Sequence, residues 1–315
     1  MITPMPTCLI VTATAQEYAE ELTRLADFPI TFKACSSAKQ ALREYTDESI
    51  LFGRPDIIAE LLPSMPTVDW VQSTWAGVTP LIVAKRRDYV LTGVKDVFGP
   101  QISEYVIGYL LAHQLRVLER MQEQQQHNWF IGLSGTLEGK RLGIMGTGSI
   151  GQHIAKTAIS LDMTVAGFSR SGTSQPGFDT VMQADRLHEF LEAIDYLVAI
   201  LPNTPDTDNL LDAAALKKLP KHAYFINIGR SNVVDDDALI DALRNNRLAG
   251  AALDVFDEEP IPQDSPLWDT PNLTITAHVA AVSYPSIIVP IFVDNYRRYL
   301  KQQPLNYVVD FAAGY

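Results

Sequence analysis

Arg230, Glu259 and His278 are of the residue types that perform acid–base and anion-binding chemistry, and each follows a predicted strand. A histidine exchanges a proton near neutral pH, and a carboxylate beside it favours and orients the protonated ring. An arginine polarises a carbonyl oxygen and holds a neighbouring carboxylate. This combination suits the reduction of a ketone, because the ketone oxygen gains negative charge and then needs a proton.

Each of these residues, taken alone, also has a structural explanation. Arg230 could be a cation at a helix start, Glu259 one charge of an acidic loop, and His278 a capped core histidine. However, the predicted strands that precede them belong to one parallel sheet, and the carboxyl ends of such strands border the ligand crevice. The three residues together are therefore the catalytic candidates.

A second signal is the spacing of glycines. Gly146, Gly148 and Gly151 form GxGxxG between a predicted strand at 142–145 and a helical pattern at 150–159. In such a motif the first glycine permits a tight turn, the second lets the backbone approach a pyrophosphate, and the third brings the helix close to the sheet. We expect dinucleotide binding here, with Ser149 and Ile150 as further contacts; the alternative is a turn without a ligand.

The segment after the next predicted strand, 163–168, bears on which dinucleotide binds. An NAD site commonly places an acidic residue there, on the ribose 2′-hydroxyl. Instead, Ser169, Arg170 and Ser171 follow the strand, while Asp162 precedes it and so lies at the wrong end. A guanidinium flanked by hydroxyls suits a 2′-phosphate. We therefore predict NADP, with NAD as the alternative if Arg170 is only an exposed loop residue.

The elements that must position these residues follow an α/β pattern. Apolar strands are predicted at 8–13, 30–34, 50–53, 70–74 and 89–92, with helices at 16–25 and 38–45. After Gly99-Pro100 comes a long helix, and further strands follow at 142–145, 163–168, 196–201, 224–228, 249–253 and 273–276. A last helix is expected at 287–300, with a kink or a late start at Pro290. Runs that are apolar throughout predict doubly wound parallel sheets covered on both faces.

Composition narrows the classes of function. The chain carries 37 acidic and 25 basic side chains, with a net charge of −12 and no cluster of basic residues, so no nucleic-acid partner is expected. Two cysteines and six histidines fit neither a disulfide framework nor a zinc pattern. We expect no metal, and a reducing cytoplasm as the compartment. Because no apolar run approaches ~20 residues, no membrane partner is expected.

Several motifs resemble, in the same order, those of the D-2-hydroxyacid dehydrogenases, whose members reduce 2-oxo acids with a nicotinamide cofactor. They are the segments 137–140 before the glycine motif, 201–207, 227–230, 253–256 with 259–260, and His278. The resemblance covers essentially the whole chain. It implies a Rossmann cofactor domain at 100–284, inserted into a flavodoxin-like substrate domain of 1–99 plus 285–315, and a homodimer formed through the cofactor domain.

The resemblance also implies a role for each matching residue. Arg230 would bind the substrate's carboxylate and carbonyl, and Glu259 would pair with His278, the general acid in reduction and the base in oxidation. Asp254 resembles the residue that faces the nicotinamide carboxamide. The segments expected to line the cofactor contain Leu201, Pro202, Ile228 and Gly229.

The loop 73–80 is the further site expected in the substrate domain. Backbone N–H groups of Ala76, Gly77 and Val78 can point at an anion, and the start of a following helix would add to the attraction. In the family this loop holds the substrate carboxylate. Trp75, which stands where a small or polar residue is more common, makes the chain similar to the glyoxylate/hydroxypyruvate reductase branch; alternatively, it is a packing residue.

These signals together predict an NADPH-dependent reductase of small 2-oxo acids, glyoxylate or hydroxypyruvate first, that forms the D-hydroxy acid. A bulkier 2-oxo acid is one alternative, and phosphite oxidation would use the same three residues. An alternative from another class is a nucleotide-sensing protein that recruits partners, like the transcriptional corepressors of the family.

Overall fold

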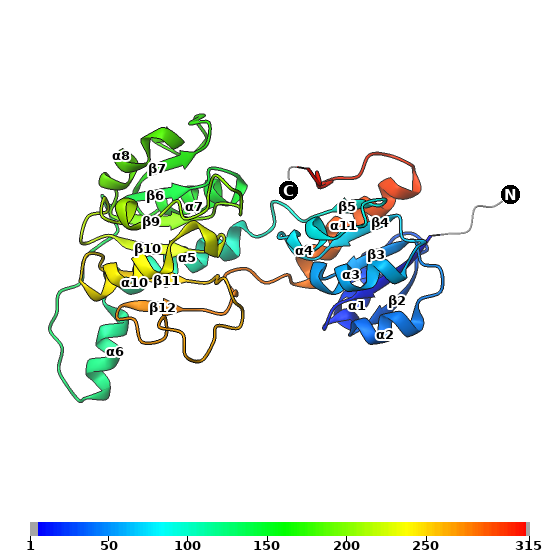
Figure 1. Ribbon diagram of the computed structural model, residues 1–315, viewed down its shortest axis with the longest axis horizontal. Helices are drawn as coiled ribbons and strands as arrows, with labels where there is room; N and C mark the ends of the chain where they lie inside the picture. The colour runs from blue at the N-terminus through cyan, green and yellow to red at the C-terminus, as the bar shows by residue number, and fades with distance from the viewer. Residues whose placement is uncertain (1–5, 313–315) are drawn as a thin grey trace. The chain divides into compact units, whose positions relative to one another are not determined.

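A computed structural model describes residues 6–312 of the chain. The chain divides into two compact units, the first made of Met1–Val97 with Ser283–Tyr315, the second of Phe98–Val282. Each unit is built on one parallel sheet, which confirms the expected fold class (Figure 1). Within residues 6–312, no helix has the length and apolar character that crossing a bilayer requires.

The first unit has a five-stranded sheet in the order β2-β1-β3-β4-β5. Its strands are β1 (Thr7–Val11), β2 (Thr31–Cys35), β3 (Ile50–Gly53), β4 (Trp70–Ser73) and β5 (Val90–Thr92). Its helices are α1 (Ala15–Leu25), α2 (Ala38–Glu44), α3 (Pro55–Leu61), α4 (Thr79–Val83) and α11 (Pro285–Leu300). The order turns back at β1 and β3, so ligand-binding loops are expected after these strands.

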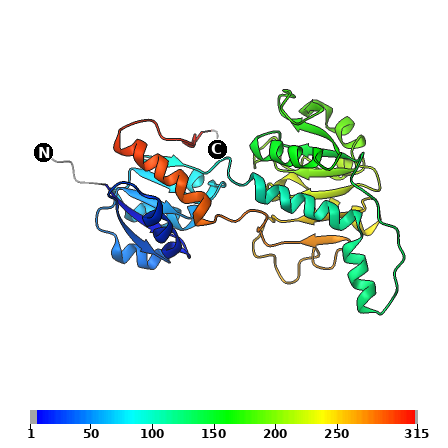
Figure 2. The same cartoon turned by 180° about the vertical axis from the view of Figure 1, so that it is seen from behind.

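Aromatic packing joins α11 to this sheet, although the two are far apart in sequence. The ring of Phe292 stacks on Phe52 of β3 at 4.4 Å and on Trp70 of β4 at 5.3 Å between centroids. The helices α1 and α11 lie together on one face (Figure 2), and α2, α3 and α4 pack against each other on the other. Both faces are covered, and the central strands β1 and β3 accordingly consist almost entirely of buried apolar residues.

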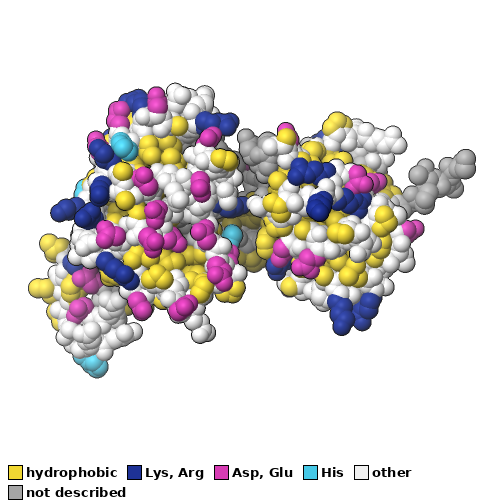
Figure 3. All heavy atoms as spheres, in the orientation of Figure 1, with side chains coloured by type: hydrophobic (Ala, Val, Ile, Leu, Met, Phe, Trp, Pro, Cys, Tyr) yellow, Lys and Arg dark blue, Asp and Glu magenta, His cyan; other side chains and the backbone are white. Residues whose placement is uncertain are grey.

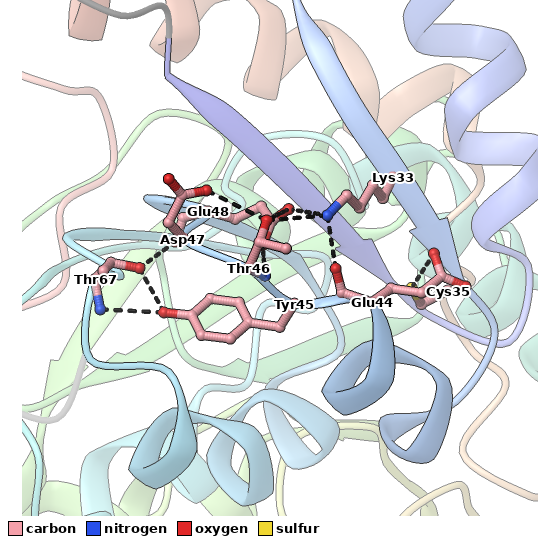
Figure 4. A network of polar contacts seen from close by, with 8 residues as sticks. All are labelled: Lys33, Cys35, Glu44, Tyr45, Thr46, Asp47, Glu48 and Thr67. Carbon is pink, nitrogen blue, oxygen red and sulfur yellow. Dashed lines mark hydrogen bonds and ion pairs between the residues drawn. The ribbon is translucent and has the colours of Figure 1, made fainter.

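A polar network outside this core ties β2 to the turn before β3 (Figure 4). Lys33 Nζ lies 2.5 Å from the buried carboxylate of Glu48, and it also donates to the carbonyl oxygen of Glu44 at 2.6 Å. The other oxygen of Glu48 accepts the backbone N–H of Thr46 at 2.8 Å. Since this network satisfies the Glu48 carboxylate locally, we assign it to the fold of this turn.

The second unit has a seven-stranded parallel sheet in the order β12-β11-β10-β9-β6-β7-β8. The strands are β6 (Arg141–Met145), β7 (Thr164–Ser169), β8 (Thr180–Gln183), β9 (Tyr196–Ala199), β10 (Tyr224–Asn227), β11 (Gly250–Leu253) and β12 (Leu273–Ile275). The helices are α5 (Gly99–Gln114), α6 (Val117–Gln125), α7 (Ser149–Ile159), α8 (Leu187–Glu192), α9 (Ala213–Leu216) and α10 (Asp236–Arg244). The strand order reverses at β6, which carries the glycine motif at its carboxyl end.

The structure differs from the sequence-based expectations in three places. The edge strand β8 was not expected, because its residues are exposed or half-buried and form no apolar run. The long helix after Pro100 breaks at Arg116 (φ 55°), because α5 packs on the sheet while α6 buries none of its residues. The last helix does not start late at Pro290: it begins at Pro285, where a missing N–H costs no hydrogen bond.

Figure 3 shows acidic side chains spread over the face of the second unit that it presents. The segment 235–237 places three acidic residues at the start of α10, where Asp235 is the N-cap and its carboxylate accepts the N–H of Ala238 at 3.0 Å. Negative charge near the N-terminus of a helix interacts favourably with the helix dipole.

Candidate active site

The turn between β6 and α7 has the geometry that its glycines predict. Gly146 has a φ of 111°, a conformation that other residues adopt only with strain, and its N–H donates to Phe168 of β7 at 2.9 Å. A Cβ on Gly151 would lie 2.1 Å from the carbonyl oxygen of Gly146. Only glycine at 151 therefore allows α7 to start this close to the strand.

The same turn leaves room in front of the helix. A Cβ on Gly148 would meet no atom within 4 Å, and Gly148 and Ser149 are exposed. The first N–H groups of a helix have no partner within the helix, so those of Ser149, Ile150 and Gly151 are open to an anion. The residues therefore fit a dinucleotide phosphate by conformation and by hydrogen-bonding capacity.

Arg170 follows β7, the strand adjacent to β6, on the same edge of the sheet. The turn is held by its own hydroxyls: Ser169 Oγ accepts the N–H of Gly172 at 3.2 Å, and Ser171 lies 2.8 Å from Thr173. Arg170 itself is exposed, and its guanidinium makes no hydrogen bond or ion pair with any other residue of 6–312. This free cation fits a phosphate better than an uncharged ribose hydroxyl.

The segments after β9 and β10 pack backbone against backbone. A Cβ on Gly229 would lie 2.9 Å from the backbone nitrogen of Leu201, and the amide of Asn227 holds the turn by donating to the Arg230 carbonyl at 3.0 Å. The carbonyl oxygen of Pro202 accepts a hydrogen bond from the Thr207 hydroxyl at 2.8 Å, which closes the turn after β9. Leu201, Pro202, Ile228 and Gly229 are thus brought to one edge of the sheet, beside the glycine turn.

Arg230 is a half-buried cation whose charge is not balanced by an ion pair in the described part of the chain. Its Nη1 donates to the carbonyl oxygen of Gly229 at 2.7 Å, and no ion pair with it is formed anywhere in residues 6–312. Burial lowers the pKa of Arg230, and the nearby charge of Glu259 opposes that shift. A half-buried guanidinium without a partner carboxylate is suited to bind an anionic ligand.

Glu259 joins the loop after β11 to His278. One carboxylate oxygen accepts the backbone N–H of Phe256 at 3.0 Å, and the other lies 2.9 Å from Nδ1 of His278. His278 follows β12 and adopts a φ of 54°. With Nδ1 engaged, Nε2 is the ring nitrogen left to exchange a proton. The structure thus brings Arg230, Glu259 and His278 together within the second unit.

Asp254 is 1% exposed and lies beneath the segment that carries His278. Its carboxylate accepts the N–H groups of Val279 and Ala280, each at 2.9 Å, and the Thr276 hydroxyl at 2.5 Å. Tyr105 of α5 lies 2.7 Å from the same hydroxyl. Sequence reasoning missed Tyr105 and Thr276, since nothing in their local pattern pairs residues 171 positions apart.

The loop 73–78 of the first unit follows β4. Ser73 Oγ donates to the Trp75 carbonyl at 2.8 Å and accepts its N–H at 3.0 Å, which turns the chain. Within residues 6–312, the N–H groups of Ala76, Gly77 and Val78 donate no hydrogen bond. Three successive free N–H groups suit an anion. The expected helix follows directly, since α4 begins at Thr79, but it has only five residues; its contribution to anion binding stays a prediction.

Trp75 has a partner that the sequence did not indicate. The guanidinium of Arg54, which follows β3, lies 4.7 Å from the centre of the Trp75 ring and pairs with Asp56. This contact fixes one face of Trp75, whose side chain nevertheless remains partly exposed. The stretch from 54 to 56 lacks a recognisable motif, so only the order of strands, with β3 beside β4, could have indicated Arg54.

Comparison with protein families gives one match over more than half of the chain. The family described as D-isomer specific 2-hydroxyacid dehydrogenase, NAD binding domain, matches residues 107–280. Among curated relatives, glyoxylate/hydroxypyruvate reductase A of Salmonella newport (strain SL254) is 34% identical over 218 residues, covering 69% of this chain and 70% of that protein.

Solved structures extend the likeness to nearly the full length. A D-isomer specific 2-hydroxyacid dehydrogenase family protein from Aeromonas salmonicida has a TM-score of 0.93 at 39% identity, covering 98% of this chain and 99% of that one. An NADPH-dependent glyoxylate/hydroxypyruvate reductase from Sinorhizobium meliloti, solved in complex with NADP and sulfate, has a TM-score of 0.86 at 28% identity, covering 98% and 100%.

Proposed function

Because the chain belongs to the D-isomer-specific 2-hydroxyacid dehydrogenase family, we propose that it reduces small 2-oxo acids, glyoxylate or hydroxypyruvate first, with NADPH. The product is the D-hydroxy acid where the carbon is chiral. The observation that carries this proposal is the 2.9 Å contact between Glu259 and Nδ1 of His278, with the unpaired Arg230 close to the same carboxylate. That set provides a proton donor and an anion-binding group for a 2-oxo acid.

The second unit is the cofactor domain in this proposal, and the first is the substrate domain. When bound, NADPH supplies the hydride that reduces the carbonyl carbon. The turn at Gly146, Gly148 and Gly151 binds the pyrophosphate through the first N–H groups of α7. Arg170, with Ser169 and Ser171 beside it, binds the 2′-phosphate, and the Sinorhizobium relative is named as NADPH-dependent. The backbone of Leu201, Pro202, Ile228 and Gly229 lines the remainder.

The acid and the anion-binding group have separate tasks. Arg230 holds the carboxylate of the substrate and polarises its carbonyl, so that negative charge developing on oxygen meets a fixed cation. His278 gives its proton from Nε2 to that oxygen. Glu259 fixes the ring through Nδ1 and stabilises its positive charge before the proton leaves. In the oxidative direction His278 takes the proton back.

In the first unit, the loop 75–78 is assigned to the substrate's carboxylate. The free N–H groups of Ala76, Gly77 and Val78 provide donors without a full counter-charge, which suits a ligand that must be released. Trp75, whose ring is covered on one face by Arg54, is assigned to the same substrate loop. The compartment is the cytoplasm in this proposal, where Cys8 and Cys35 stay as the buried free thiols seen here.

The chain acts as a homodimer through the second unit, because a surface there is unusually apolar. The surface is made by α6 and the segment after it, with Leu118 51%, Met121 54%, Trp129 93%, Ile131 79% and Leu133 88% exposed. Hydrophobic side chains are visible at the surface around α6 in Figure 3. So many large exposed apolar side chains within one segment are uncommon on a monomer.

Sedimentation analysis tests the dimer. The wild-type chain should sediment at twice its 34.9 kDa mass, and Trp129→Glu with Met121→Glu should reduce it to the single mass. A wild-type monomer at micromolar concentration would refute a dimer of this kind.

The reaction is tested by following NADPH absorbance with glyoxylate, hydroxypyruvate, pyruvate and a bulkier 2-oxo acid, and by assigning the configuration of each chiral product. We expect turnover, with the highest kcat/KM for one of the first two acids and only D products. No turnover with any 2-oxo acid, together with NADPH binding, would overturn the proposal and favour a nucleotide-sensing role.

A further inference from the structure

We propose that Tyr105, Thr276 and Asp254 form a hydrogen-bonded chain whose task is to hold His278 in position for proton transfer. This inference rests on the proposed function, since it takes His278 as the proton donor. All four residues lie within the second unit. Among the hydrogen bonds and ion pairs of residues 6–312, none joins these three to the ring of His278, so they are positioning residues.

One residue, Asp254, holds three successive backbone N–H groups. Its carbonyl oxygen accepts the N–H of His278 at 2.9 Å, one carboxylate oxygen accepts that of Val279, and the other accepts that of Ala280, both at 2.9 Å. The carboxylate is buried, so each of these bonds forms without competition from water. The backbone on both sides of the His278 side chain is thereby fixed to the end of β11.

This fixation is needed because His278 has a φ of 54°. A residue with a Cβ has a higher free energy in that conformation than at negative φ. It keeps the conformation only where its surroundings impose it. If the three N–H groups were released, the backbone at 278 would return to negative φ. The ring would then turn away from Glu259, and the 2.9 Å contact between Nδ1 of His278 and the Glu259 carboxylate would be lost.

The chain continues from Asp254 to helix α5. Thr276 donates its single hydroxyl hydrogen to Asp254 at 2.5 Å, so the hydrogen bond of 2.7 Å between Thr276 and Tyr105 must use the hydrogen of Tyr105. Burial raises the pKa of Tyr105, which keeps that hydrogen in place. Tyr105 therefore orients the Thr276 hydroxyl toward Asp254. The Asp254 carboxylate also accepts the N–H groups of Val279 and Ala280.

A different role for Asp254, as a direct contact of the nicotinamide, makes a different prediction. A residue that binds the cofactor changes the affinity for NADPH, whereas a residue that positions the acid changes kcat. Tyr105 and Thr276 distinguish the two roles best, because both act on Asp254 from the side of α5 and β12.

The test compares Tyr105→Phe, Thr276→Val, Thr276→Ser and Asp254→Asn with the wild type. Tyr196→Phe is the control, because it also removes a tyrosine hydroxyl that bonds to α5, in this case to Gln114 at 2.6 Å. For each variant, kcat, the KM for the 2-oxo acid, the dissociation constant of NADPH, the melting temperature and the exchange rates of the Val279 and Ala280 amides are measured.

We expect Tyr105→Phe and Thr276→Val to lower kcat by roughly five- to tenfold and to speed exchange of both amides, while the NADPH dissociation constant changes by less than about twofold. Thr276→Ser should restore the wild-type values, and Tyr196→Phe should leave them unchanged. If the hydroxyl deletions leave kcat and amide exchange at wild-type values, or act only on NADPH affinity, the proposed chain is wrong.

The amide exchange also separates this inference from the proposed function. The wild type could lack activity on 2-oxo acids and still show slow exchange of the Val279 and Ala280 amides, with fast exchange in Thr276→Val. That result would overturn the proposed reaction, while the hydrogen-bonded chain that holds residues 278–280 would stand.

Discussion

The carboxylate of Glu259 bridges two loops, with one oxygen on the N–H of Phe256 at 3.0 Å and the other 2.9 Å from Nδ1 of His278. The loop after β11 and the segment after β12 are thus held by one side chain. Because the N–H of Phe256 fixes the orientation of this carboxylate, its second oxygen is directed at the ring. In the proposed reaction, this contact orients the histidine that gives its proton to the substrate.

Glu259→Gln tests the charge of this pair while keeping its shape. The amide oxygen still accepts the N–H of Phe256, but it no longer stabilises an imidazolium, so kcat for 2-oxo acid reduction should fall by about 10–100-fold. Steady-state kinetics at saturating NADPH measures the effect, with Glu258→Gln as the neighbouring control. A Glu259→Gln enzyme with wild-type kcat would show that the charge is not used.

Arg230→Lys tests whether the fork of the guanidinium is needed. Lysine keeps the positive charge but cannot form two parallel hydrogen bonds to a carboxylate. The KM for the 2-oxo acid should rise by about 10–100-fold, with a smaller change in NADPH affinity. Equal losses in both, or an unchanged KM, would mean that Arg230 does not bind the substrate.

Arg170→Ala tests the cofactor assignment. Because the guanidinium has no protein partner within residues 6–312, its removal should lower kcat/KM for NADPH by at least about tenfold while leaving that for NADH nearly unchanged. Arg186→Ala, which removes an exposed arginine paired with Glu189, is the matched control. A wild-type preference for NADH, or an unchanged NADPH preference in Arg170→Ala, would refute the role of Arg170.

Much of the architecture could be predicted because buried parallel strands appear in the sequence as short apolar runs. The runs at 50–53 and 142–145 became strands of the same extent or one residue longer. In parallel sheets the loops after the strands share one edge, so the convergence of Arg230, Glu259 and His278 followed from topology. The glycine turn was readable because its geometry demands particular residues.

The remainder depended on tertiary contacts. The strand β8 is an edge strand without an apolar run, and the break at Arg116 reflects where the sheet stops supporting the helix, not a local signal. The bonds that join Asp254 to Thr276, 22 positions away, and Thr276 to Tyr105 exist only after the unit has folded. The residues that support His278 were invisible for this reason.

Asp236, at the first position of α10, gives the stability of the protein a predictable dependence on pH. Burial, followed by the charges of Asp257, Asp235 and Asp237, raises the pKa of Asp236 to about 6. A raised pKa means that the folded state binds the proton more tightly than the unfolded state. Its contribution to stability is therefore full below about pH 4 and is lost as the pH rises through about 6.

Asp236→Asn removes this dependence. The free energy of unfolding of the variant, relative to wild type, should increase by roughly 1–3 kcal/mol between pH 4 and pH 7. Urea denaturation at several pH values measures it. Two curves that stay parallel across that interval would contradict the assignment.

The central claim, that His278 is the acid of a 2-oxo acid reductase, is tested most directly by His278→Gln. The measurement is the rate of NADPH oxidation with glyoxylate, taken beside the dissociation constant of NADPH. The wild type should turn over, and the variant should bind NADPH within about twofold of wild type while losing about 10²–10⁴-fold in kcat. A variant that binds NADPH and keeps the wild-type turnover would contradict the account.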